Sequence, residues 1–283
     1  MDSLVTTEWL AHEMGASDLR IVDASKHLPD TGRDARAEYE AAHIPGAVFM
    51  NLDDLVDSTA PIENTLPPAD KFASRMQQLG LGDGSRIVLY DDSAVKTSAR
   101  AWYMLRMFGA QNVALLDGGI GLWKAQGRPV NSGVEKLRCR HFTVWSDGKA
   151  VRSKAQVLAN ISSGAEQLVD ARGKPRFTGA EREMRAGIAS GHIPGSLNVP
   201  YGQMFNPDGT WNDEAGLRAA FAGAGLDLDR PVITSCGSGV TACCLAFGLH
   251  LIGKRDVTLY DGSWTEWGAD AALPKALGVA VPA

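Results

Sequence analysis

The 283-residue chain has only four cysteines, and no two of them form a C-x-x-C pair. This small number excludes a disulfide framework, and the spacing excludes a zinc site built on cysteine pairs. The chain also lacks any run of basic residues, and its formal net charge is −5. A nucleic-acid partner is therefore not expected.

Targeting and membrane segments are not evident either. The N-terminal residues MDSLVTTEWLAHEMG include early acidic side chains and no apolar core. They resemble neither a secretory signal nor an Arg-rich transit peptide, so the expected location is the cytoplasm. Pro231 to Gly253 is a long stretch free of Asp, Glu, Lys and Arg. Pro231 and the sequence Gly237-Ser238-Gly239 would interrupt a membrane helix, and no membrane span is expected.

The same uncharged stretch contains the main candidate for chemistry. The apolar run Val232–Ser235 predicts a buried strand, Cys236 follows it, and residues 240–252 predict a helix that ends at Gly253. The first N–H groups of a helix favour negative charge, so a thiolate at Cys236 would be stabilised. Cys236 is thus a candidate nucleophile. The alternative is an inert core thiol, because free cysteine is often buried.

The other cysteines of this helix are expected to be core residues. Cys243 lies about two helical turns beyond Cys236, too far for a disulfide. Cys243 and Cys244 are therefore predicted to pack in the interior rather than to act as resolving thiols.

Four segments of the first half recur in the second half in the same order, each displaced by about 145 residues. The pairs are 20–24 with 167–171, 42–47 with 191–196, 86–91 with 231–236, and 115–119 with 259–263. The chain is therefore predicted to contain two copies of one domain, residues 1–140 and 141–283. The polar residues 131–148, with Gly133, Asp147 and Gly148, are expected to form a linker.

Each copy alternates short apolar runs with helical stretches. In the first copy we expect strands at 19–22, 47–50, 87–90 and 113–116, and helices at 7–14, 68–79, 96–108 and 119–125. This alternation predicts an α/β fold in which a mainly parallel sheet is flanked by helices. Active loops of such folds lie at the carboxyl ends of the strands, where Cys236 is placed.

The two copies differ at the cysteine. Asp91 matches Cys236, and the residues after Asp91 lack glycine, so the first copy cannot repeat the same covalent chemistry and is expected to serve as a scaffold. His-Ile-Pro-Gly occurs in both copies and predicts a turn. His192 is expected to be structural, whereas a role for His43 stays open.

Arginines are concentrated before the second His-Ile-Pro-Gly. Arg172, Arg176, Arg182 and Arg185 fall between two predicted strands, in a segment expected to be a loop. A guanidinium can hold a carboxylate through two parallel hydrogen bonds. The alternative is a solvated charge cluster without a specific role.

The duplicated HIPG, Asp91 in the first copy and CGSGVT at residues 236–241 resemble the two-domain rhodanese family over nearly the whole chain. The loop is most similar to the 3-mercaptopyruvate sulfurtransferase branch. The resemblance implies two tandem rhodanese-like domains and an enzyme that transfers sulfur from 3-mercaptopyruvate through a persulfide on Cys236, releasing pyruvate. A reduced thioredoxin, a small thiol or cyanide would accept the sulfur, and neither a metal nor an organic cofactor is implied.

The resemblance also implies roles for single residues. Gly237, Gly239, Val240 and Thr241 would cradle the persulfide, and Arg176 and Arg185 would hold the substrate carboxylate. Ser238, together with His43 and Asp34 of the first domain, resembles a polar relay.

Three alternative functions compete with this hypothesis. The first is a thiosulfate:cyanide sulfurtransferase. Such enzymes resemble one another in having cationic residues in the loop, as in CRKGVT, whereas this chain has Gly237 and Ser238 at those two positions. A cysteine phosphatase needs Cys-x5-Arg, and Ala242 occupies the arginine position. A persulfide carrier without multiple turnover is the third alternative.

Overall fold

The computed structural model describes residues 1–145 and 148–279, which divide into two compact units. The first comprises Met1–Ser58, Leu66–Asp147 and Asn206–Trp211, and the second comprises Thr59–Thr65, Gly148–Phe205 and Asn212–Ala283. Each half of the sequence thus contributes one short segment to the unit formed by the other half. The boundary near residue 140 stays a prediction. Residues 146 and 147 of the predicted linker, and residues 280–283, lie outside the described residues.

The first unit is built on a parallel sheet with the strand order β1-β5-β4-β2-β3. Val22 on the interior strand β2 is paired with Leu89 on β4 and with Val48 on β3. The central strands are apolar on both faces because helices cover both. The strands are β1 (Leu4–Val5), β2 (Leu19–Asp23), β3 (Ala47–Phe49), β4 (Arg86–Tyr90) and β5 (Val113–Leu116).

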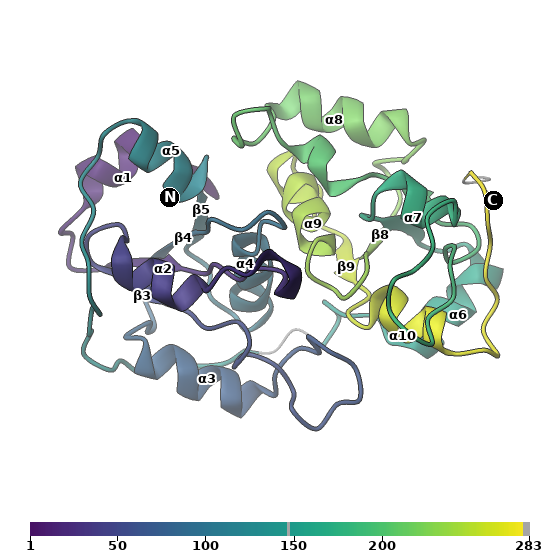
Figure 1. Ribbon diagram of the computed structural model, residues 1–283, viewed down its shortest axis with the longest axis horizontal. Helices are drawn as coiled ribbons and strands as arrows, with labels where there is room; N and C mark the ends of the chain where they lie inside the picture. Colours follow the sequence, from purple (N-terminus) through teal and green to yellow (C-terminus); the bar gives the residue numbers. More distant parts are fainter. Residues whose placement is uncertain (146–147, 280–283) are drawn as a thin grey trace. The chain divides into compact units, whose positions relative to one another are not determined.

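Helices pack on both faces of this sheet. Leu10 of α1, Tyr39 of α2 and Trp123 of α5 share one core cluster with the strands, and Figure 1 shows α1 and α5 together, away from α3. Phe72 of α3 stacks on Phe108, which follows α4. The helices are α1 (Thr7–Glu13), α2 (Ala35–Ala41), α3 (Ala69–Gln78), α4 (Ser98–Met107) and α5 (Gly119–Ala125), with a 3-10 turn, η1 (Pro29–Thr31).

The four strands and four helices predicted for the first copy are confirmed, each to within two residues at either end. The structure adds β1 and α2, which were not predicted. β1 has only two residues, and α2 has the sequence ARAEYEA, in which Tyr39 alone is buried. Neither segment carries enough apolar periodicity to be recognised. Asp34 starts α2, because its carboxylate accepts hydrogen bonds from the N–H groups of Arg36 and Ala37.

The second unit repeats the architecture with a parallel sheet in the order β7-β6-β8-β9. A single parallel bridge between Val151 and Leu259 takes the place that β1 has beside β5 in the first unit. The strands are β6 (Gln167–Asp170), β7 (Leu197–Asn198), β8 (Val232–Ser235) and β9 (Val257–Leu259). The predicted fold class, a parallel sheet flanked by helices in each of two copies, is confirmed.

Aromatic residues fill one face of the second sheet. Val157 of α6 packs with Trp264 and Trp267 of α10 in a single core cluster. Figure 1 shows α8 and α9 together in this unit, apart from α6 and α10. The helices are α6 (Lys154–Ser163), α7 (Lys174–Thr178), α8 (Glu214–Gly223), α9 (Ala242–Leu251) and α10 (Ser263–Ala269), with a 3-10 turn, η2 (Tyr201–Met204).

The helix after Cys236 agrees with the sequence, although it is shorter than the predicted 240–252. Cys243 and Cys244 have no exposed surface, so their prediction as core residues is confirmed. Within the described ranges, no helix combines the length and the apolar character that crossing a bilayer requires.

The predicted linker packs on the first unit rather than running free. Phe142 is 4% exposed, and the backbone N–H and hydroxyl of Thr143 donate to the Asp83 carboxylate at 2.8 and 2.6 Å. Phe142 of the linker therefore contributes to the first core, whereas Trp145 is 73% exposed.

A buried carboxylate distinguishes the first copy. Asp23 ends β2 and is 3% exposed, and its carboxylate accepts the Ser25 N–H. In the second unit the matching Asp170 forms an ion pair with Arg172 at 2.7 Å, whereas Ser25 stands at the arginine position. Burial, reinforced by the nearby charge of Asp91, raises the pKa of Asp23 to about 6.

Replacing this carboxylate should therefore stabilise the fold at neutral pH. A folded pKa near 6, above the unfolded value of 3.8, means that the ionised form opposes folding above pH 6 and that this penalty vanishes below about pH 4. Asp23→Asn should raise the free energy of unfolding by up to about 3 kcal/mol at pH 8 and by much less at pH 4.

Urea unfolding at the two pH values measures this difference. Asp30→Asn, at an exposed position of η1, is the matched control and should show no such pH-dependent gain. An Asp23→Asn protein that is destabilised at both pH values would contradict the account.

Candidate active site

Cys236 lies at the carboxyl end of β8, a strand in the interior of the second sheet. It is 2% exposed, and all four residues of β8 are buried. The chain then forms an irregular loop until Thr241 begins α9 as its N-terminal cap residue. The predicted order of strand, cysteine, glycine loop and helix is confirmed.

The loop after Cys236 presents backbone donors. In the part of the chain that is described, no protein group accepts a hydrogen bond from the N–H of Gly237, Ser238, Val240 or Thr241. Gly239 has a φ of 78°, in the left-handed region that glycine enters without steric cost. Unpaired N–H groups before a helix carry partial positive charge. The loop can therefore stabilise a negative charge at Cys236.

In the first unit, the N–H donors of the equivalent loop have a protein acceptor in place of a cysteine. Asp91 follows β4 as Cys236 follows β8, and its carboxylate accepts the N–H groups of Ser93 and Ser98 at 2.8 Å each. Ser98 is the first residue of α4. The first copy thus carries its own anion at the helix start. In the second copy that negative charge must come from the Cys236 sulfur or from a ligand.

Arg176 reaches the Cys236 loop from α7. The prediction of a loop for this segment was wrong at Arg176, because Pro175 favours a helix start and Gly179, at a φ of 76°, ends the helix. A Cβ atom added to Gly237 would lie 3.7 Å from Arg176 Nη2. This guanidinium also pairs with Glu183 at 2.8 Å.

Arg185 approaches the same glycine from the irregular segment after α7. Its Nη1 would lie 3.9 Å from a Cβ atom on Gly237, and it donates a hydrogen bond to Thr265 Oγ1. The Thr265 hydroxyl in turn donates to the Gly237 carbonyl at 2.6 Å. The structure thus brings both predicted carboxylate-binding arginines to the loop.

Arg172 has a different, structural environment. It is 3% exposed, its guanidinium forms a buried ion pair with Asp170, and it lies 4.6 Å from the Trp264 ring centroid. Arg182 is exposed. Only two of the four arginines therefore have contacts that suit ligand binding.

Glu183 was missed by the sequence reasoning, although it is one of two acidic residues, with Glu181, in an arginine-rich stretch. It is 8% exposed. Burial raises the pKa of its carboxyl, but the hydrogen bond and the charge of Arg176 outweigh burial and leave the pKa below its ordinary value. Glu183 therefore stays ionised at neutral pH and fixes the position of Arg176.

Ser238 has a side chain without a protein partner. It is half-buried, and among the described residues no group forms a hydrogen bond with its hydroxyl. It is therefore available to a bound substrate. Its role in a polar relay stays a prediction.

His43 and Asp34 belong to the first unit, and each has a structural contact there. The His43 ring is fully buried, stacks on Tyr39 and bonds the Tyr39 carbonyl through Nδ1 at 2.8 Å. His192 makes the same pair of contacts with Phe177. Both histidines therefore anchor the His-Ile-Pro-Gly turn, and Asp34 caps α2. A further part for His43 and Asp34 in catalysis stays a prediction.

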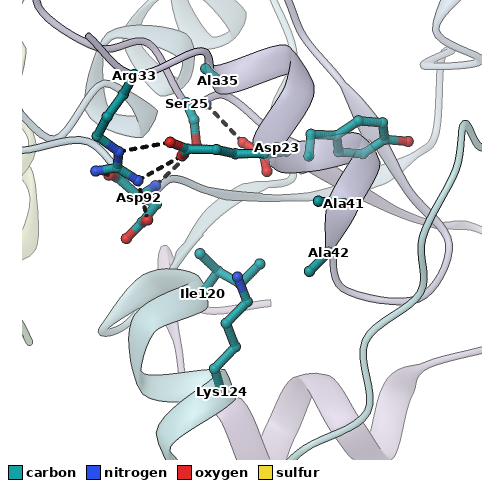
Figure 2. Close-up of a pocket in the computed structure, with 11 residues that line it drawn as sticks. Asp23, Ser25, Arg33, Ala35, Ala41, Ala42, Asp92, Ile120 and Lys124 are labelled. Atoms are coloured by element: carbon teal, nitrogen blue, oxygen red, sulfur yellow. Dashed lines mark hydrogen bonds and ion pairs between the residues drawn. The ribbon is translucent and has the colours of Figure 1, made fainter. Parts of the chain in front are cut away.

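The carboxyl edge of the first sheet carries a pocket of about 270 Å³ (Figure 2). Figure 2 shows Asp23 and Ser25 on one side and Lys124 on the other. Arg33 links Glu38 and Asp92 across the wall at 2.6 Å each. No residue that lines this pocket is a cysteine, which agrees with a scaffold role for the first copy.

Two stretches of the chain, residues 6–126 and 153–270, match the family model described as the rhodanese-like domain. The chain belongs to the rhodanese family. The family predicted from the duplicated motifs is thereby confirmed, and the two matched stretches correspond to the two copies.

This rhodanese is similar to named sulfurtransferases over almost its whole length. It is 40% identical over 271 residues to human 3-mercaptopyruvate sulfurtransferase, covering 94% of this chain and 91% of the relative. It is 39% identical over 272 residues to Chinese hamster (Cricetulus griseus) thiosulfate sulfurtransferase, covering 94% and 91%. The crystal structure of SseA from Escherichia coli, described as a 3-mercaptopyruvate sulfotransferase, matches with a TM-score of 0.85 and 35% identity, covering 93% and 99%.

Proposed function

We propose that this chain is a 3-mercaptopyruvate sulfurtransferase that uses Cys236 as the sulfur carrier. The observation that supports it most is the position of Arg176 and Arg185, whose guanidinium nitrogens lie within 4 Å of a Cβ atom placed on Gly237. Two cations beside an otherwise neutral loop suit a substrate with one carboxylate and a separate sulfur atom.

The reaction begins with attack of the Cys236 thiolate on the sulfur of 3-mercaptopyruvate. The carbon–sulfur bond breaks, and its electron pair passes to the carbon as the enolate of pyruvate, which takes up a proton. Cys236 then carries a persulfide. An acceptor thiolate attacks the outer sulfur in the second step, and Cys236 leaves as a thiolate, so the enzyme is regenerated.

The loop supports both steps through electrostatics. The thiolate, the developing negative charge on the sulfur pair and the persulfide all lie beside the N–H groups of Gly237–Thr241. Donors that are already oriented stabilise charge without reorganisation during the reaction. A neutral loop also leaves the arginines as the nearest cations, so the substrate carboxylate is held apart from the reacting sulfur.

Thiosulfate is the second candidate donor, because a thiosulfate sulfurtransferase is among the similar proteins. Thiosulfate is a compact dianion in which both charges lie close to the transferred sulfur. Gly237 and Ser238 provide no side-chain cation there. We therefore propose 3-mercaptopyruvate rather than thiosulfate as the preferred sulfur donor. The third alternative, a persulfide carrier without multiple turnover, ranks after both enzymatic functions.

The acceptor is expected to be a thiol, such as reduced thioredoxin or a small thiol, or cyanide. Ser238, with His43 and Asp34, is proposed as a polar relay for the proton transfers. A cytoplasmic location remains part of the proposal.

Donor kinetics test the function directly. We expect kcat/KM for 3-mercaptopyruvate to exceed that for thiosulfate by about tenfold or more, because the second charge of thiosulfate lacks a side-chain cation. Cys236→Ser should lower turnover with either donor by at least about 1,000-fold. Cys139→Ser, at an exposed cysteine, is the control and should keep full activity. A higher kcat/KM for thiosulfate would contradict the assigned substrate.

The carboxylate site is tested by removing one arginine. Arg185→Ala should raise KM for 3-mercaptopyruvate by about 10- to 100-fold, the range expected for losing a charge-assisted hydrogen bond. Its effect on kcat should be smaller, because the reacting sulfur is untouched. Arg182→Ala is the matched control, since Arg182 lies in the same segment but is exposed. Equal KM values for the two variants would remove Arg185 from the site.

A further inference from the structure

The first turn of α10 holds the peptide groups on both sides of Cys236. The Cys236 N–H donates to Ser263 Oγ at 3.1 Å. The N–H groups of Trp264 and Thr265 donate to the carbonyls of Cys236 and Gly237 at 2.9 Å each. Every backbone polar group from the Cys236 N–H to the Gly237 carbonyl, except the Gly237 N–H, is thus bound by α10.

This arrangement has an electrostatic consequence for the sulfur. A carbonyl oxygen carries partial negative charge, so a carbonyl turned toward the Cys236 sulfur would oppose a thiolate there. The bonds to α10 fix both carbonyl oxygens toward that helix. Within the same segment, the Gly237 N–H is the backbone donor that α10 does not bind. The partial positive charge of the loop N–H groups is therefore not cancelled by these carbonyl oxygens.

Ser263 adopts a conformation that serine seldom takes. Its φ is 50°, in the left-handed region, while the matching residue of the first copy is Gly119 with a φ of 56°. Glycine would occupy this position without steric cost. Strain of this kind persists where the surrounding structure makes use of it.

The Ser263 hydroxyl both donates and accepts a hydrogen bond. Ser263 has no exposed surface, and its hydroxyl donates to the Tyr260 carbonyl at 2.8 Å. This bond directs an oxygen lone pair to the Cys236 N–H. Without the hydroxyl, that N–H would be a buried donor without a protein acceptor.

The first copy lacks these contacts. Gly119 has no hydroxyl, and within the described residues the N–H groups of Ile120 and Gly121 do not donate to Asp91 or Asp92. The α10 contacts therefore occur in the copy that carries the cysteine and are missing in the copy that carries Asp91.

We propose that Ser263 is a positioning residue for sulfur transfer, which holds the Cys236 amide so that the sulfur faces the loop N–H groups. The proposal rests on Cys236 as the sulfur carrier. Arg176 and Arg185, which approach the loop, and Glu183, which pairs with Arg176, make no hydrogen bond or ion pair with Ser263 among the described residues.

Two substitutions separate the hydroxyl from the backbone strain. Ser263→Gly removes both, and Ser263→Ala removes the hydroxyl alone. Both variants should lower kcat with 3-mercaptopyruvate by about tenfold, the effect of one buried hydrogen bond, with KM within about twofold of wild type. Both should move the midpoint of Cys236 alkylation by iodoacetamide to higher pH, by up to about one unit. Their melting temperatures should differ, with Ser263→Gly the more stable because the strain is relieved.

Ser196→Ala is the matched control. Ser196 is 1% exposed in the same unit, and its hydroxyl donates to the Ile193 carbonyl at 2.6 Å. This variant should lose stability while keeping the wild-type kcat and alkylation midpoint.

Two results would overturn the inference, and they are distinguishable. Ser263 variants with the wild-type kcat and alkylation midpoint, alongside an inactive Cys236→Ser, would overturn the role of Ser263 alone. An active Cys236→Ser would overturn the proposed function and this inference with it.

Discussion

The loop between β8 and α9 carries backbone N–H groups that no described protein group accepts. Folded proteins satisfy nearly all backbone N–H donors with an acceptor. A cluster of unpaired N–H groups at a helix start therefore favours binding of a negatively charged group. The Cys236 thiolate lies at the start of this loop and can supply that negative charge. The strand fixes the cysteine, the glycines let the backbone curve around the sulfur, and α10 holds the neighbouring carbonyls away. The arginines then add a place for a carboxylate beside this loop.

The two copies place different groups beside the N–H donors of this loop. In the first copy the Asp91 carboxylate accepts the N–H groups of Ser93 and Ser98, so a side chain of the protein satisfies these donors. In the second copy a sulfur can hold the charge as a thiolate, carry a second sulfur and lose it again. The differences around the two loops follow from this. Ser263 replaces Gly119, and Arg172 with Trp264 replaces Ser25 with Ile120. The duplication therefore supplies an internal comparison in which one scaffold serves structure and the other can serve catalysis.

Much of this was available from the sequence. Apolar runs such as Val113–Leu116 have both the length and the composition of buried strands, and the structure places β5 there. The cysteine loop was predictable because strand, glycine and helix signals are all local. The short helix α7 was missed, because five residues rich in charge carry no periodic pattern and depend on Pro175 and Gly179. Glu183 and Thr265 were missed because their importance lies in contacts with Arg176 and Arg185. Ser263 was visible only as a difference from Gly119, and its strain appears only with the backbone angles.

The central claim is that Cys236 accepts the sulfur atom. The most direct test is mass spectrometry of the intact protein and of its peptides after exposure to 3-mercaptopyruvate without an acceptor. The account predicts that the peptide containing Cys236 gains the mass of one sulfur atom, that pyruvate is released in equal amount, and that an added thiol removes the extra mass. Pyruvate formation without added mass on the Cys236 peptide, or added sulfur on Cys139 instead, would contradict it.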